Sequence, residues 1–221
     1  MKSIISQTDK LIVVGETYIK FDYIYNQFNQ EKLANILIPL INSNRVSEAL
    51  KKNQFSVSIE FTEGSLKVKV FYLSLTILNL VNNYGSFREG IDRIVNDFRN
   101  VSSYIIIAVN NEPDINEIDI LRNERRTGLP GRIQDIYIRI DHLEKQLPEL
   151  SNNQIEEELN SIKHQIANIL PLMEENEKES FIEELDNKYK QDLPDPQETK
   201  VNYLVNRYAL KPDNRMKLTN Y

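Results

Sequence analysis

The sequence has no cysteine and no tryptophan, and it contains only 2 histidines and 6 glycines among its 221 residues. Without cysteine, the chain can form no disulfide bond, thiolate nucleophile or cysteine-based zinc site. Two histidines are too few for a histidine-rich metal centre. We therefore expect neither a metal ion nor another cofactor, and we assign no catalytic residue.

The N-terminus lacks the long apolar run of a signal peptide. The apolar segment from Leu11 to Val14 is short, and no small-residue cleavage site follows it. The absence of cysteine fits a reducing compartment. We expect a protein that is cytoplasmic or associated with the inner membrane, and that is not secreted.

Charge is unevenly distributed along the chain. The formal net charge is −6, from 27 Lys and Arg against 33 Asp and Glu. Residues 1–131 contain 15 basic and 15 acidic side chains, whereas residues 132–221 contain 12 and 18. Because a nucleic-acid backbone needs a basic stripe, we expect no broad nucleic-acid-binding face on the acidic part. A local basic patch can still bind an anion.

Hydrophobic periodicity predicts a mixed N-terminal half. Residues 11–25 are rich in β-branched and aromatic residues and are expected to be extended, with a turn at Gly15-Glu16. Apolar residues at helical spacing predict a helix over 30–41. Residues 55–72 form two alternating runs around Glu63-Gly64, which predict a β-hairpin with one buried face.

The rest of the chain is predicted to be largely helical. Ser86 and Glu89 fit a capping box at the start of one helix, and Ser151 and Gln154 fit another. The expected elements are a helix over 88–98, a buried strand over Ser102–Val109, a helix from Ile115 to about Arg126, two long amphipathic helices within 132–170, an acidic helix over 174–192 and a short helix over 203–208.

Together these patterns predict an α+β fold. A small N-terminal mixed domain with a β-hairpin and short helices (1–111) leads through an Arg/Gly connector (112–131) to an antiparallel helical hairpin and acidic helix (132–192), then to a C-terminal tail (193–221). An isolated helical hairpin buries its apolar stripes poorly. The hairpin is therefore expected to pack on the N-terminal domain or on a second copy of the chain.

The apolar segment over 66–83 permits two interpretations. As one helix beginning after Ser65, it would carry a single polar stripe at spacings of three and four, formed by Lys69, Tyr72, Thr76, Asn79 and Asn83. Several copies could turn this stripe toward a pore or an assembly surface. The helix would span about 24 Å, less than the roughly 30 Å hydrocarbon core. The sequence favours the alternative, a hairpin strand followed by a buried helix.

Arginines and glycines cluster around the predicted start of a helix: Arg122, Arg125, Arg126, Gly128, Gly131 and Arg132. Backbone N–H groups at a helix start, with guanidinium groups nearby, suit a phosphate or another anion. The alternative is that these arginines pair with the acidic helices downstream. The absence of a phosphate-loop pattern favours that alternative.

The acidic residues and histidines suggest little catalytic chemistry. Glu89, Asp92 and Asp97 share one predicted helix, and His142 and Glu144 share another. Glu89 and Asp92 are one helical turn apart, as a metal or acid–base pair requires. No second cluster follows at a spacing that would complete such a site.

Two short motifs flank the apolar segment, Glu63-Gly64-Ser65-Leu66 before it and Tyr84-Gly85-Ser86-Phe87-Arg88-Glu89-Gly90-Ile91 after it. Over residues 55–105 the chain resembles uncharacterised bacterial proteins with this pattern, in which the helix between the motifs is often long enough to enter a membrane. Those proteins are loosely associated with anti-phage defence and with membrane- or channel-acting effectors. In this chain the apolar stretch is short and contains Lys67, Lys69 and Asn79. The resemblance implies an effector that acts by assembly and carries no catalytic assignment.

Three hypotheses of function follow. The first is a non-enzymatic homo-oligomeric effector, membrane-associated or pore-forming and gated by an anionic ligand such as a nucleotide or short oligonucleotide. The second is a soluble cytoplasmic protein-interaction or regulatory module whose acidic hairpin binds a partner protein. The third is a metal-dependent enzyme built on Glu89, Asp92 and Asp97. The missing catalytic set favours the first two over the third.

Overall fold

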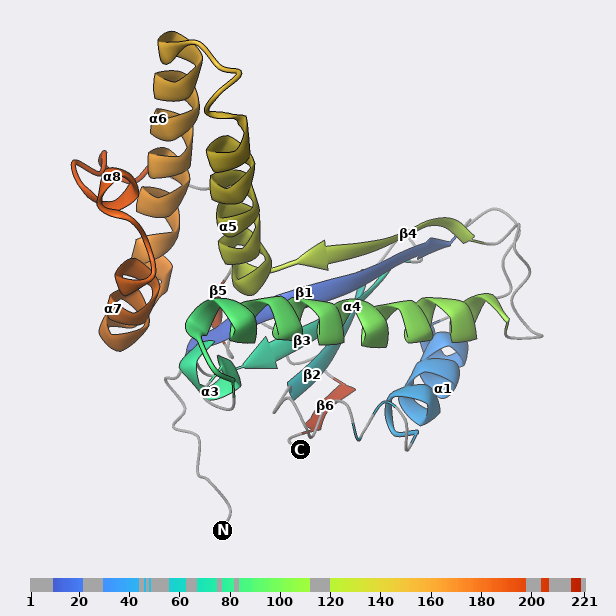
Figure 1. Ribbon diagram of the computed structural model, residues 1–221. Helices are drawn as coiled ribbons and strands as arrows, with labels where there is room; N and C mark the ends of the chain where they lie inside the picture. Colours follow the sequence, from blue (N-terminus) through green and yellow to red (C-terminus); the bar gives the residue numbers. More distant parts are fainter. Residues whose placement is uncertain are drawn as a thin grey trace.

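The computed structural model describes residues 10–21, 30–43, 46, 48, 56–62, 67–74, 77–81, 84–111, 120–197, 204–206 and 216–219. The fold is α+β, as predicted: an antiparallel sheet packs against helices, and a further group of helices stands at one end of the sheet (Figure 1).

The sheet is built around β1 (Lys10–Phe21), which pairs on one side with β3 (Lys67–Ser74) and on the other with β4 (Ile120–Thr127). β2 (Ser56–Thr62) and then β6 (Met216–Thr219) extend the sheet beyond β3, giving the order β4-β1-β3-β2-β6. β5 (Leu204–Asn206) pairs with the start of β1. The antiparallel β2–β3 pair confirms the hairpin predicted over 55–72.

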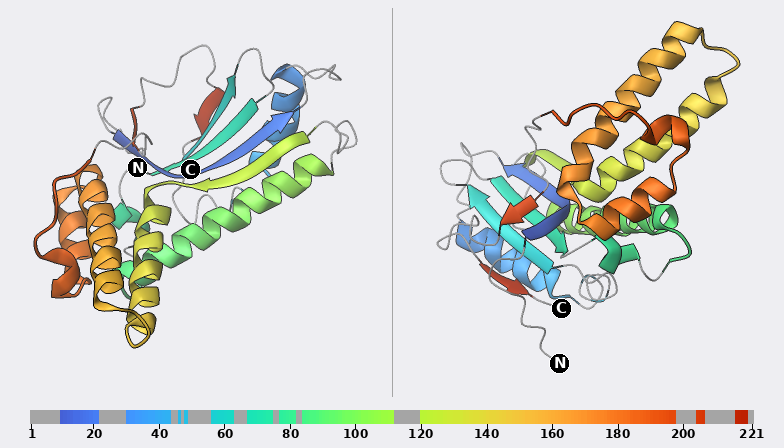
Figure 2. Two further views of the ribbon diagram at one scale, coloured as in Figure 1. Left: turned by 90° about the horizontal axis from the view of Figure 1, so that it is seen from above. Right: turned by 90° about the vertical axis from the view of Figure 1, so that its left-hand side faces the viewer.

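The connections between the strands follow a recurrent pattern. α1 (Gln30–Ile41) links β1 to β2, and α4 (Phe87–Asn110), preceded by the short α3 (Ile77–Val81), links β3 to β4. The succession βαββαβ with strand order β4-β1-β3-β2 is the ferredoxin-like arrangement. α1 and α4 contact each other, and α4 runs across β1 and β4 (Figure 1). Among the elements that the structure describes, no helix lies across the second face of the sheet (Figure 2).

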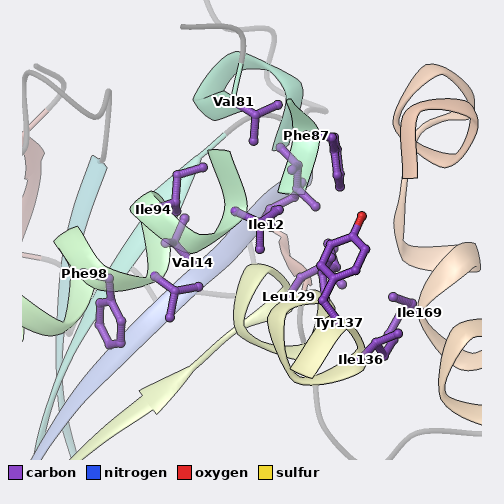
Figure 3. Packing of buried hydrophobic residues seen from close by; sticks show 14 of the residues in the cluster. Ile12, Val14, Val81, Phe87, Ile94, Phe98, Leu129, Ile136, Tyr137 and Ile169 are labelled. Carbon is purple, nitrogen blue, oxygen red and sulfur yellow. The ribbon is translucent and has the colours of Figure 1, made fainter. Parts of the chain in front are cut away.

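Side chains that point toward α4 form the core. A Cβ atom at Gly15 would lie 2.4 Å from the Phe98 ring, so a larger residue there would prevent this close approach. Two positions along β1, the Thr17 hydroxyl donates to Ser102 of α4 (2.7 Å). Figure 3 shows Phe98 beside Val14 of β1. Because side chains alternate along a strand, Gly15 and Thr17 mark the face that α4 covers, which we call the covered face. Glu16 between them belongs to the opposite face, which no described helix covers and which we call the open face.

The predicted helical hairpin is confirmed. α5 (Leu129–Gln146) and α6 (Asn152–Ile169) lie side by side, and α6 begins with the predicted capping box of Ser151 and Gln154. The 3-10 turn Leu170–Leu172, α7 (Glu175–Glu183) and α8 (Asn187–Lys190) follow. The C-terminal helices stand together at one end of the sheet (Figure 2).

α7 packs the C-terminal helices onto the sheet domain through an aromatic cluster. Phe181 is completely buried. Its ring centroid lies 6.3 Å from that of Phe87 in α4 and 5.7 Å from that of Tyr137 in α5. One side chain of α7 thus contacts both parts of the molecule, so the two share a single core.

Two carboxylates reinforce this junction. Glu177 Oε1 accepts from the Ile77 N–H at the start of α3 (2.5 Å), and Glu184 Oε1 accepts from the Phe87 N–H at the start of α4 (2.8 Å). These N–H groups have no partner within their own helices, and a carboxylate also complements the helix dipole. The acidic C-terminal segment therefore caps two helices of the N-terminal half.

Some predicted elements are wrong. The helix over 88–98 and the strand over Ser102–Val109 are one helix, α4, because apolar positions continue at helical spacing through Val101, Ile105 and Val109. The helix predicted from Ile115 to about Arg126 is strand β4 from Ile120 onward.

Three further corrections concern shorter segments. Gly15-Glu16 is no turn, since it lies inside β1 next to a register irregularity between Val13 and Gly15. The acidic helix over 174–192 is divided into α7 and α8. The short helix expected over 203–208 is replaced by β5 over Leu204–Asn206.

Candidate anion-binding face of the sheet

Strand alternation separates the arginines that cluster in the sequence. Arg122, Arg125 and Arg126 all belong to β4, whose successive side chains point to opposite faces. Arg125 lies on the α4 side, where its Nη1 donates to Ser103 Oγ (2.7 Å). Arg122 and Arg126 lie on the open face of the sheet. Arg132 is exposed in the first turn of α5, away from the strand.

Gly128 and Gly131 have a packing role at the start of α5. The Gly128 N–H donates to the Val14 carbonyl (2.9 Å), and a Cβ at Gly128 would lie 1.7 Å from the Val13 carbonyl oxygen. A Cβ at Gly131 would lie 2.1 Å from the Thr127 side chain. These two glycines thus allow α5 to begin directly against the sheet.

Three cationic residues stand in one row across the open face. Lys20 of β1 is opposite Arg122 of β4 and opposite Lys67 of β3. β2 contributes Thr62 to this row, so none of the three faces an acidic residue across the ladder. We call Lys20, Lys67 and Arg122 the cation row. Like charges placed directly opposite in a sheet are destabilising, so this register sets Lys20 between two cationic positions at an energetic cost.

The neighbouring rows of the open face are mixed in charge. The next row contains Glu124, Tyr18, Lys69 and Glu60, and the one after it contains Arg126, Glu16, Phe71 and Ser58. Register therefore places cationic residues, acidic residues and two aromatic positions on one face, with the cation row at its end. The apolar residues that alternate with them in sequence belong to the covered face.

Arg126 is held by three groups of this face. Its Nη1 donates to Glu16 Oε1 (3.0 Å) and its Nε to Glu124 Oε2 (2.7 Å). Its guanidinium carbon lies 4.3 Å from the centre of the Tyr18 ring. The hydrogen bond from Arg126 is the main cause that lowers the pKa of Glu124. The Arg126 side chain is still 44% exposed, so it remains accessible to solvent.

Lys20 and Arg122 of the cation row form fewer ion pairs in the described structure than Arg126 does. Arg122 pairs with Glu124, but its side chain remains 62% exposed. None of the ion pairs found within the described part of the chain includes Lys20. A ligand anion could therefore contact both side chains without first breaking a buried ion pair.

A shallow groove of about 500 Å³ lies at the edge of the sheet, on the α4 side, between α4 and β4. It is lined by Ser103, Ile106 and Ile107 of α4 and by Asn123, Glu124, Arg125 and Arg126 of β4. Sequence reasoning missed it, because α4 was expected to end before Ile106 and β4 was expected to be a helix.

The predicted polar stripe over 66–83 does not form. Lys69 and Tyr72 belong to β3, where residues three apart lie on opposite faces. Asn79 belongs to the short α3, and Thr76 and Asn83 lie outside the described residues. The favoured alternative, a hairpin strand followed by a buried helix, is confirmed. In the described ranges, no helix combines the length and apolar character needed to cross a membrane.

The turn motif Tyr84, Gly85, Ser86, Phe87 and Arg88 lies at the junction with the C-terminal helices. Ser86 is the N-cap of α4, and its Oγ accepts from the Glu89 N–H (3.1 Å). Arg88 pairs with Asp141 of α5, and its guanidinium lies 5.0 Å from the centre of the Tyr137 ring. These contacts give the motif a structural role in joining α4 to α5 and α7.

Two of the candidate metal and acid–base residues, Asp92 and Glu144, make structural contacts. Asp92 accepts from Gln134 Nε2 (2.8 Å), and Glu144 accepts from the Tyr189 hydroxyl (2.6 Å). In the part of the chain that the structure describes, no three His, Asp or Glu side chains are grouped closely enough to hold a metal ion.

Comparison with protein-family models, with curated proteins and with solved structures finds no match for this chain. The geometry of the sheet and its charges therefore carries the argument about function.

Proposed function

We propose that this chain is a non-enzymatic binding protein for an anionic ligand, a short single-stranded oligonucleotide, held on the open face of the sheet. The observation that carries the proposal is the cation row. Strand register places Lys20, Lys67 and Arg122 opposite one another with no acidic residue among them. A bound phosphate would attract these cations and offset their mutual repulsion.

The rest of the open face favours a nucleotide chain over an isolated anion. Single-stranded nucleic acids bind where cations track the backbone and flat groups stack on the bases. Tyr18 is only 7% exposed, and the Arg126 guanidinium carbon lies 4.3 Å from the centre of its ring, so Arg126 is more accessible to a ligand here than Tyr18. Arginine planes stack on bases as aromatic rings do. Phe71 occupies the neighbouring register position in β3.

Of the first hypothesis from the sequence, we retain the anionic ligand and do not propose the pore. The anionic ligand remains, and its site moves from the start of α5 to the sheet face. The pore is not proposed, because the helical stripe that motivated it is divided between β3 and α3. The role in bacterial defence and the homo-oligomeric state remain predictions that rest on the motif resemblance and on the amphipathic helices.

Fluorescence anisotropy tests the proposal. The probe is a fluorescein-labelled, mixed-sequence single-stranded DNA of about ten nucleotides, within the range that one small binding domain covers. The Lys20→Ala/Arg122→Ala double variant should weaken binding about tenfold or more, because two phosphate contacts are lost. Lys145→Ala is the charge-matched control for Lys20→Ala alone, since Lys145 is an exposed cation on α5, far from the open face.

Two results would reject the proposal. One is the absence of binding by the natural sequence at low ionic strength. The other is equal loss of affinity in Lys20→Ala alone and in Lys145→Ala, each of which removes one positive charge, because it would mean that only the overall charge of the protein matters.

A further inference from the structure

Among the strands that the structure describes, the outer edge of β4 is a free sheet edge. β4 is the terminal strand in the order β4-β1-β3-β2-β6, and no strand in the described ranges pairs with its outer side. In Figure 1, β4 lies along the upper margin of the sheet. The Gly128 N–H donates to Val14 of β1. Since residues alternate along an antiparallel ladder, Asn123 and Arg125 present their N–H and C=O groups to the outer side.

The two sides of this edge differ in character. On the α4 side, the groove exposes apolar surface from Ile106 and Ile107, and Ile107 is 57% exposed. On the other side stand Arg122 and Arg126, both substantially exposed. An added strand would alternate between these two environments, because its own side chains alternate between the faces.

We propose that the outer edge of β4 binds an extended peptide of a partner protein, in which apolar and acidic residues alternate. The peptide would add to the sheet through backbone hydrogen bonds to Asn123 and Arg125. Its apolar side chains would cover Ile106 and Ile107 in the groove, and its acidic side chains would reach Arg122 and Arg126.

Charge complementarity selects this occupant over a second copy of the chain. β4 carries three arginines and one glutamate in the sequence Ile-Leu-Arg-Asn-Glu-Arg-Arg-Thr. Each β4 strand carries more positive than negative side chains, so antiparallel pairing of two β4 strands would bring two positively charged strands together, and like charges directly opposite in a sheet are destabilising. Charged residues on an edge strand protect it from self-association in this way. An acidic partner strand removes that repulsion.

The experiment uses a synthetic peptide of the length of the 8-residue strand β4, acetylated and amidated, with Val and Glu alternating and a fluorophore at one end. Two further peptides carry N-methyl groups on alternate backbone amides. The first is methylated on the odd-numbered amides and the second on the even-numbered amides. In an added strand only one set of amides faces β4. We expect one methylated peptide to lose at least tenfold in affinity for the full-length protein and the other to bind nearly as well as the parent. No binding of the parent peptide, or equal binding of the two methylated peptides, would overturn the proposal.

A protein variant provides an independent measurement. Asn123→Pro removes an outward N–H group, which an edge strand tolerates because its ladder bonds lie on the other side. Asn123→Ala is its control. We expect at least tenfold weaker peptide binding for Asn123→Pro and no change for Asn123→Ala. If Asn123→Pro fails to fold, Ile107→Asp provides the test, since a carboxylate in the groove should repel the peptide to a similar extent.

Different variants test the peptide site, which is independent of the proposed function, and the oligonucleotide site. Lys20→Ala should weaken oligonucleotide binding and leave peptide affinity unchanged, because Lys20 belongs to β1, one strand in from the edge. Asn123→Pro should leave oligonucleotide binding unchanged. Loss of peptide binding in Lys20→Ala would contradict the edge-strand site while leaving the sheet-face proposal intact.

Discussion

Replacing Lys20 by glutamate should stabilise the protein while weakening its proposed function. Lys20 lies between Arg122 and Lys67 in the sheet. The substitution changes two like-charge neighbours into two opposite-charge pairs. If Lys20 instead stabilised the folded state, replacing it by glutamate would lower the stability.

The size of the effect follows from the cross-strand geometry. Each directly opposed pair contributes roughly 0.2–1 kcal/mol, with a sign set by the charges. Lys20 is half-buried and Arg122 is largely exposed, so solvent screening reduces the interaction energy of each charge pair. The expected gain in unfolding free energy is about 1 kcal/mol, which corresponds to a rise in Tm of about 2–4 °C for a chain of this size.

Urea denaturation followed by circular dichroism measures this gain at low salt and again in 1 M NaCl. The gain should nearly disappear at high salt, where the screening length falls to about 3 Å. Lys145→Glu makes the same change in charge in the last turn of α5, where a helix favours a cation, and should lower stability by a few tenths of a kcal/mol. A loss of stability in Lys20→Glu, or a gain that salt leaves unchanged, would refute the like-charge argument.

Three other predictions concern the packing of the two halves. Phe181→Ala should lower the unfolding free energy by about 3–5 kcal/mol in urea denaturation, since the ring is fully buried; a change below about 1 kcal/mol would contradict the shared core. Gly128→Ala should lower Tm markedly in calorimetry, because its Cβ would meet the Val13 carbonyl at 1.7 Å. Burial raises the pKa of Glu177 above 4.5, so the folded state binds the proton more tightly. The stability of the natural protein should therefore fall relative to Glu177→Gln as pH rises above about 4.5, and a constant difference would contradict this.

The sequence predicts the parts of the fold in which local signals agree with packing. The β2–β3 hairpin alternates along β2 and through Val70 in β3, and Val57 is buried on the covered face as the alternation requires. The α5–α6 hairpin combines an apolar stripe with the capping box of Ser151 and Gln154. At these positions propensity, periodicity and cap chemistry favour the same structure.

Local signals conflict where the predictions fail. The run from Ser102 to Val109 has the β-branched composition of a strand, but tertiary packing overrides propensity, since Ser102 reaches Thr17 from α4. β4 has almost no apolar pattern, because it is an edge strand with one open face, and its arginines resemble a helix surface. The charge alternation of Arg122, Glu124 and Arg126 was the available strand signal.

The candidate site could not be assembled from the sequence alone. Lys20, Lys67 and Arg122 are separated by 47 and 55 positions and meet only through the register of β1 with β3 and β4. Register depends on which faces are buried, and the assignment of Arg122 to a helix removed β4 from the sheet. The clustered arginines pointed to an anion, but the cations that complete the row come from the other two strands.

The salt dependence of oligonucleotide binding tests the central claim most directly. For single strands, the slope of log Kd against log salt concentration is about 0.7 for each phosphate that the protein neutralises. The account predicts that the Lys20→Ala/Arg122→Ala variant lowers this slope by about 1.4, whereas Lys145→Ala leaves it unchanged. A slope that is the same in the natural protein and the double variant would contradict the claim that the cation row binds the phosphate backbone.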